Sequence, residues 1–204
     1  MANVALIGAS GNVGTRLVKE LSDRGHQVSA IARSPEKIAA LPGVTAKAGD
    51  LFDAPALAAL LAGHDAVISA VGFVASDPEK LLEAVRASNV RRYLVVGGAG
   101  SLESAPGQRL IDGPDFPEAY RAEAEAGAAY LDRLRVDASD LDWTFLSPSA
   151  LFFPGTRSGS FRLGGNQLLV NEQGSSISFE DYAIAMVDEL ERPAHIRQRF
   201  TVGY

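Results

Sequence analysis

The chain has 204 residues, with 19 Lys and Arg against 25 Asp and Glu, a net charge of -6 and 0 cysteines. The absence of cysteine excludes disulfide scaffolds, thiolate zinc sites, iron–sulfur clusters and cysteine nucleophiles, and the negative charge argues against a general nucleic-acid binder. We expect a small-molecule partner and a cytoplasmic protein, because no stretch approaches the roughly 20 apolar residues of a membrane span.

Apolar runs alternate with helical patterns through the first two thirds of the chain, which is typical of βαβ units on a parallel sheet. The apolar runs predict strands at residues 3–7, 27–32, 44–48, 65–71 and 93–96. The helical patterns predict helices at residues 12–24, 35–41, 54–62 and 78–88.

The regular alternation stops after Gly100. Residues 101–117 hold two glycines and three prolines, too many for the interior of a helix or strand, and a connection of that length is often a functional lid. The later patterns predict helices at 118–136 and 178–190, strands at 141–146 and 199–202, and a hairpin over 159–171. We predict an α/β fold with one doubly wound, mostly parallel Rossmann domain over residues 1–204, in which residues 150–180 form a small C-terminal cap on the substrate side.

A glycine-rich turn joins the first predicted strand to the first helix. Gly8 would allow the tight turn, Gly11 the close approach of a pyrophosphate, and Gly14 the packing of the helix on the sheet. The backbone N–H groups placed to bind phosphate at the positive end of the helix are those of Ser10, Asn12 and Val13. The alternative is a plain strand-to-helix turn.

The end of the second predicted strand bears on which nucleotide binds. An acidic residue there is typical of NAD(H), whereas arginine suits the 2′-phosphate of NADP(H). The chain has Arg33 and Ser34 at this point, with Lys37 one turn further on. We therefore predict NADP(H) in preference to NAD(H), the alternative being an ordinary solvated arginine.

Two further segments follow strands on the same edge of the predicted sheet. Asp50 and Leu51 would bind adenine through a carboxylate and a backbone amide, although Asp50 is also placed to cap the next helix, a role for which Asp53 is better placed. The small residues Ala70, Val71 and Gly72 would let the cofactor pass, or would simply form a tight turn.

These residues together resemble the atypical short-chain dehydrogenases/reductases, in particular the biliverdin/flavin reductase-like and NmrA-like proteins and the NAD(P)H-flavin reductases of that group. The resemblance covers essentially the whole chain. It implies that the segments after the fourth, fifth and sixth strands surround the nicotinamide, which would place there Gly72, Phe73, Gly98, Ser101, Ser147 and Pro148. It also implies a homodimer, since relatives commonly pair through their helices.

The chain departs from the wider superfamily in its catalytic pair. Typical members use Tyr-x-x-x-Lys, but the four lysines here all lie at or before Lys80. Tyr120 falls near the place of the family tyrosine and has Ala124 four residues later. Reduction of an ordinary ketone needs a positioned acid, whereas a flavin or quinone spreads the added charge and can take its proton from water.

We therefore expect an oxidoreductase that passes hydride from NADPH to a flat conjugated acceptor of flavin or quinone type. Ser101 and Tyr120 are the candidate substrate-side donors, and Phe73, Phe152 and Phe153 the candidate pocket wall. Three scattered histidines do not make a metal site. Two alternatives remain open: a non-catalytic NADP(H)-dependent redox sensor of NmrA-like type, and a sugar-nucleotide epimerase or dehydratase.

Overall fold

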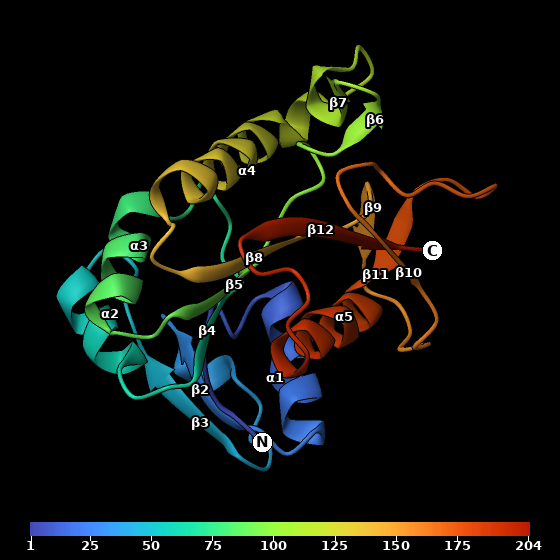
Figure 1. The fold of residues 1–204 in the computed structure, drawn as a ribbon. Helices are drawn as coiled ribbons and strands as arrows, with labels where there is room; N and C mark the ends of the chain where they lie inside the picture. Colours follow the sequence, from blue (N-terminus) through green and yellow to red (C-terminus); the bar gives the residue numbers. More distant parts are fainter.

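The computed structural model describes residues 1–204 and contains an eight-stranded central sheet (Figure 1). Its strands run in the spatial order β10-β12-β8-β5-β4-β1-β2-β3 and are parallel except for β10, which is antiparallel to β12. Their bounds are β1 Asn3–Ile7, β2 Gln27–Ala32, β3 Val44–Ala48, β4 Ala66–Ser69, β5 Arg92–Val96, β8 Asp142–Ser147, β10 Arg162–Gly164 and β12 Gln198–Gly203. The predicted α/β Rossmann fold is confirmed.

Helices cover both faces of the sheet (Figure 1). Two of them, α1 Asn12–Asp23 and α5 Phe179–Glu191, pack together on one face. The other face carries α2 Ala54–Leu61, α3 Pro78–Ala87 and α4 Glu118–Asp137. Each face has its own buried hydrophobic cluster, which explains why the central strands are nearly continuous apolar runs.

Local capping sets where several helices begin. The Asp53 carboxylate accepts from the amide of Ala56 at the start of α2, and Asp77 accepts from two amides at the start of α3. Ser178 accepts from Asp181 at the start of α5. Such caps satisfy amides that have no partner inside the helix. Helix α1 has no side-chain cap.

The helix predicted at residues 35–41 is wrong. Only a 3-10 turn, Pro35–Lys37, forms there, because Ile38 takes an extended conformation and ends it. Gly43 then turns the chain with a φ of 72° into β3.

The hairpin predicted over residues 159–171 is also wrong. Strand β10 pairs with Thr201–Gly203 of β12 rather than with a second arm of its own segment. The neighbouring residues 166–168 bond instead to Glu103. The remaining strands form two small sheets, β6 Glu103–Ala105 with β7 Gln108–Arg109, and β9 Leu151–Phe153 with β11 Ser176–Ser178.

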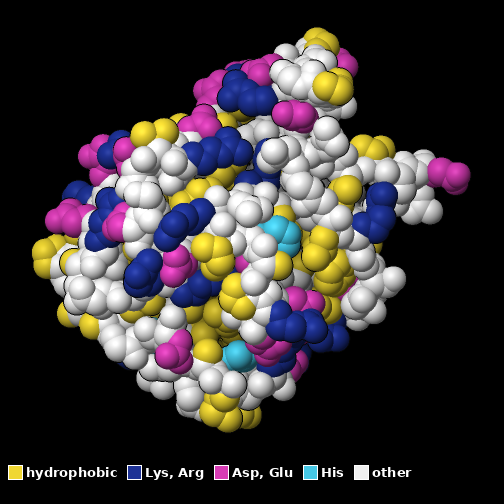
Figure 2. All heavy atoms as spheres, in the orientation of Figure 1, with side chains coloured by type: hydrophobic (Ala, Val, Ile, Leu, Met, Phe, Trp, Pro, Cys, Tyr) yellow, Lys and Arg dark blue, Asp and Glu magenta, His cyan; other side chains and the backbone are white.

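Charged side chains of both signs are interspersed on the face seen in Figure 2, over α3 and α4 as well as near α1 and α5. Arg86 pairs with Asp140, and Arg24 bonds to Asp188 and Glu191. None of the helices combines the length and the apolar character that crossing a membrane requires.

Candidate functional site

The turn between β1 and α1 can be built only with glycine at two positions. Gly8 has a φ of 81°, and a Cβ there would lie 2.4 Å from the carbonyl oxygen of Ala70. A Cβ on Gly14 would lie 2.1 Å from the carbonyl oxygen of Gly8. The turn is therefore pressed between the end of β4 and the first turn of α1.

The amino end of α1 presents free backbone donors. Its N-cap is Gly11, which has no side chain to cap it. The amides of Asn12, Val13 and Gly14 donate to no other group of the protein. Free N–H groups at the positive end of a helix attract anions, phosphate above all.

A cavity of about 270 Å³ opens beside this turn; we call it the glycine-turn cavity. The predicted site residues that line it are Gly8, Ser10, Gly11, Arg33, Ser34, Asp50, Leu51, Ala70, Val71 and Gly72. Lys37, which accompanies Arg33 in the prediction of NADP(H), also lines it, as do Ile7, Ile31, Ala32, Gly49, Phe52 and Ala75. The structure thus brings together the ends of β1, β2, β3 and β4.

The two cations of the glycine-turn cavity are Arg33 and Lys37. Both are exposed, and neither side chain makes a hydrogen bond or an ion pair within the protein. They are free to meet an anionic group at this end of the cavity.

Asp50 and Asp53 divide their tasks after β3. One oxygen of Asp50 accepts from the Phe52 amide, which closes a tight turn. Asp53 caps α2, the role for which it is the better placed of the two in the sequence. Asp50 therefore keeps acceptor capacity toward the glycine-turn cavity, which it lines.

Phe73, in the loop after β4, lies against β8, α4 and the turn after β5. Its ring is 6.0 Å from that of Phe145 and 5.8 Å from that of Tyr130, measured between centroids. A Cβ on Gly127 would come within 2.9 Å of the ring, and one on Gly98 within 3.9 Å. Gly98 and Phe73, both predicted near the nicotinamide, are thus neighbours.

A residue outside the predicted site, Glu123, holds the same loop. Its carboxylate accepts from the amides of Phe73 at 2.6 Å and Val74 at 3.0 Å. We call this contact the Glu123 latch. In the sequence Glu123 reads as one acid of a solvated helix face, since its partners lie about fifty residues away; no local signal identifies it.

Position 124, where the superfamily has lysine, is used for packing. A Cβ on Gly100 would lie 2.7 Å from the Cβ of Ala124, so α4 rests almost directly on the turn after β5. Tyr120, one turn earlier, is 68% exposed and lines none of the cavities described here. On the face of α4 that would carry a tyrosine–lysine pair, the small side chain of Ala124 thus packs against the main chain at Gly100.

Two residues of the lid segment, residues 101–117, anchor it to the rest of the protein. Leu102 and Ile111 are buried, and the Ile111 amide donates to the carbonyl of Gly100. The hydroxyl of Ser101 accepts from Arg199 at 3.3 Å. The candidate donor Ser101 is therefore the first residue of the lid segment itself, half-buried and held by a residue from β12.

Ser147 and Pro148 are buried at the end of β8. The Ser147 hydroxyl has no hydrogen-bond partner although it is completely enclosed. Such orphaned groups are uncommon.

The two aromatic residues of β9 do not reach the glycine-turn cavity. Phe152 packs edge-on against Phe179 and lies 4.8 Å from the ring of Tyr182, on the side of the sheet that α5 covers. Burial raises the pKa of Tyr182 well above its usual range, and its hydroxyl donates to the Leu146 carbonyl. Phe153 is half-buried beside Gly155.

The three histidines have structural partners. His26 contacts Glu191, His64 contacts Ser29, and His195 contacts Glu189 while stacking on a phenylalanine ring. No three His, Asp or Glu residues are grouped in a way that would hold a metal ion.

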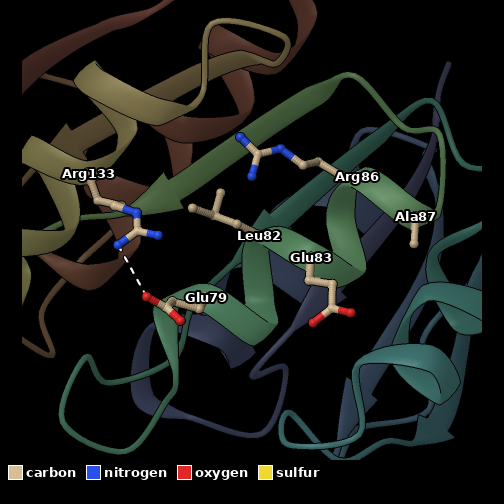
Figure 3. Close-up of a pocket in the computed structure, with 6 residues that line it drawn as sticks. All are labelled: Glu79, Leu82, Glu83, Arg86, Ala87 and Arg133. Atoms are coloured by element: carbon tan, nitrogen blue, oxygen red, sulfur yellow. Dashed lines mark ion pairs between the residues drawn. The ribbon is translucent and has the colours of Figure 1, made fainter.

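A second hollow of about 520 Å³ lies between α3 and α4 (Figure 3). It is lined by Glu79, Leu82, Glu83, Arg86, Ala87 and Arg133. Figure 3 shows Arg133 and Glu79 pointing toward one another, and their nearest atoms are 3.2 Å apart. No residue from the end of a central strand contributes, so this groove is separate from the glycine-turn cavity.

Comparison with known proteins agrees with this geometry. A family model described as NAD(P)H-binding matches residues 8–193. A structure from Burkholderia pseudomallei described as a "putative exported protein" is 47% identical with a TM-score of 0.90, each chain covered over 100%.

Two further structures carry enzyme descriptions. One from Bacteroides thetaiotaomicron, a "putative epimerase", is 38% identical with a TM-score of 0.94, covering 100% of this chain and 98% of its own. One from Streptococcus pneumoniae, a "putative NADH-flavin reductase", is 40% identical with a TM-score of 0.83, covering 100% and 99%.

Proposed function

Because the chain belongs to the NAD(P)H-binding family, we propose that it is an NADPH-dependent reductase of a flat conjugated acceptor such as a flavin or quinone. The observation that carries the proposal is the pairing of the glycine-turn cavity with a helix α4 that has Ala124 packed on Gly100 where the catalytic lysine would stand. The description of the S. pneumoniae structure supports the same acceptor class.

The residues present fit the cofactor. A side chain at Gly8 or Gly14 would clash with the main chain of the turn and of the end of β4, so glycine keeps this turn tight. The free amides at the start of α1 match a pyrophosphate. Arg33 and Lys37 favour a 2′-phosphate, so we propose NADPH rather than NADH.

The protein orients the cofactor and the acceptor and excludes water from them, rather than supplying an acid or a base. Bound NADPH would supply the hydride, which carries two electrons to the acceptor, while water supplies the proton. The Glu123 latch holds the loop of Gly72 and Phe73 in place. Orientation and exclusion of water are general sources of rate.

The test measures NADPH oxidation by the purified protein with riboflavin, FMN and a benzoquinone as acceptors. The control variant is Gly11→Asp, which places a carboxylate at the anion-attracting end of α1 and should abolish turnover. Equal rates for the wild type and this variant with every acceptor would reject the proposal.

A second candidate function is a redox sensor that binds NADP(H) without turnover. The anchoring of the lid segment favours it, since Leu102 and Ile111 are buried and their amides bond to the turn after β5. Calorimetry with NADP+ and NADPH separates the two functions. A sensor distinguishes the two oxidation states and oxidises no cofactor, whereas a reductase turns over.

The description of the B. thetaiotaomicron structure raises an epimerase as a third candidate. The missing tyrosine–lysine pair weighs against it, because epimerisation through a keto intermediate needs a proton carrier. Appearance of a C4-epimerised sugar nucleotide in an incubation with NAD+ would favour this function over the reductase.

A further inference from the structure

Arg199 is a buried cation on the substrate side of the sheet. It lies in β12, is 8% exposed, and is paired in register with Phe145 of the neighbouring strand β8. Laterally paired residues of a sheet point to the same face, so Arg199 lies on the face that α4 covers. Its position along the sheet is close to the carboxyl ends of the strands, since Phe145 pairs with Val95 and Val95 pairs with Ser69, the last residue of β4.

The partners of this guanidinium are all neutral. Its Nε donates to the Asn166 side-chain oxygen at 2.9 Å, and its Nη1 to the Ser101 hydroxyl at 3.3 Å. Its Nη2 makes two longer contacts of 3.4 Å, to the carbonyls of Ser101 and Asn166. No carboxylate lies within ion-pair distance, which is unusual because buried charges are normally paired.

The surroundings leave the charge uncompensated. Burial and the nearby Arg135 together lower the pKa of Arg199 to about 10, against the opposing effect of Glu103 in the lid segment. At neutral pH the guanidinium is still charged. A protein with a net charge of -6 thus keeps one buried cation without an acidic partner beside its substrate edge.

A second unsatisfied group shares this face. Ser147 lies two residues after Phe145 on β8 and pairs with Thr201 of β12, so its side chain points to the same side as Arg199. Its buried hydroxyl has no partner. A cation with only neutral partners and a free hydroxyl are the groups that an anionic oxygen needs.

A route to the guanidinium exists. Asn166 is exposed and Ser101 is half-buried, and both contact Arg199 through long or neutral hydrogen bonds. Moving the exposed Asn166 side chain would uncover the guanidinium and leave the buried Leu102 in place.

We propose that Arg199, screened by Asn166 and Ser101 in this structure, is the binding site for the anionic group of the acceptor, and that the acceptor is a phosphorylated flavin-like molecule rather than a neutral one. The identification of the ligand as an acceptor rests on the proposed reductase function. The anion site itself can be tested without turnover.

The experiment measures equilibrium binding of FMN and riboflavin by quenching of their fluorescence, with and without NADP+. The two probes share one ring system and differ by a phosphate. We expect the wild type to bind FMN about tenfold more tightly than riboflavin, the scale of a charge-assisted hydrogen bond. In Asn166→Asp, the new carboxylate pairs with the guanidinium of Arg199, so the ratio of the FMN affinity to the riboflavin affinity should fall close to one.

The variants keep the result interpretable. Asn166→Asp gives the buried cation an acidic partner, so its Tm should equal or exceed that of the wild type, which excludes misfolding as the cause. Arg199→Gln should lose the FMN preference as well. Arg133→Gln, an exposed arginine in the groove between α3 and α4, should keep it.

Two results would overturn the anion site: equal affinity for FMN and riboflavin in the wild type, including no binding of either, or an unchanged ratio in Asn166→Asp. If the wild type prefers FMN over riboflavin but oxidises no NADPH, the reductase function is rejected and the anion site is retained. If NADPH is oxidised equally well with FMN and with riboflavin, the anion site is rejected and the reductase function is retained.

Discussion

At the scale of single residues, Arg33 decides the choice of nucleotide in our proposal. It is exposed at the end of β2 and has no partner in the protein. We expect Arg33→Ala to weaken NADPH binding about tenfold, as loss of a charge-assisted bond to phosphate does, and to leave NADH binding nearly unchanged. Calorimetric titration with both cofactors measures this.

Lys19→Ala is the matched control, because Lys19 is an exposed cation paired with Asp23 on α1. Equal losses for NADPH and NADH in Arg33→Ala would mean that the arginine does not read the 2′-phosphate.

Asp181 is a single residue with a structural task. It is fully buried and accepts from the amides of Ser158 and Gly159 and from the Tyr204 hydroxyl. Replacing it by asparagine removes the charge and converts one acceptor into a donor. We expect Asp181→Asn to lower the free energy of unfolding by about 2 kcal/mol, the scale of charged hydrogen bonds, as measured by urea denaturation. Loss of under about 0.5 kcal/mol, typical of surface changes, would contradict this role.

At the scale of elements, helix α4 organises the loops around it. It touches the loop after β4 through the Glu123 latch and the turn after β5 through Ala124 on Gly100. We expect Glu123→Ala to speed hydrogen exchange at the amides of Phe73 and Val74, because both lose their acceptor. NADPH binding should weaken several-fold, since the loop lines the glycine-turn cavity.

Glu125→Ala is the control for this prediction. Glu125 is exposed on the same helix and bonds to no loop. Unchanged exchange at Phe73 and Val74 in Glu123→Ala would show that the latch contributes nothing to the loop.

At the scale of the whole molecule, buried carboxylates make stability depend on pH. Burial opposes ionisation of Asp181 and Glu189, but hydrogen bonds outweigh it: Asp181 accepts from Ser158, Gly159 and Tyr204, and Glu189 from His195 and Ala194. The pKa of each therefore lies below its ordinary value. Their stabilisation is present above the unfolded-state pKa of about 4 and is lost as pH falls through the folded-state values.

We therefore expect the urea midpoint of unfolding to fall steadily below about pH 4.5 and to change little from there to neutrality on account of these groups. The measurement is a series of urea titrations between pH 7 and pH 3. Asp181→Asn should show a shallower acid decline than the wild type. A midpoint that rises on acidification would contradict the sign of the effect.

Local patterns in the sequence were sufficient for much of the fold and one half of the site. The glycine turn directly follows strand β1, and its glycines have a recognisable spacing. Arg33 directly follows strand β2. Patterns within a few residues of one another therefore reveal these features. The same holds for Asp53, whose partner Ala56 is three residues away. These features are set by short-range geometry.

Only the tertiary structure decided the other half. The Glu123 latch, the packing of Ala124 on Gly100 and the contact of Arg199 with Ser101 join residues that are about 25 to 100 positions apart. Strand β10 likewise pairs with β12 and not with its own neighbours. Which distant groups meet depends on the packing of the whole chain, because no local spacing encodes it, and the surroundings of Phe73 and Arg199 are built from such contacts.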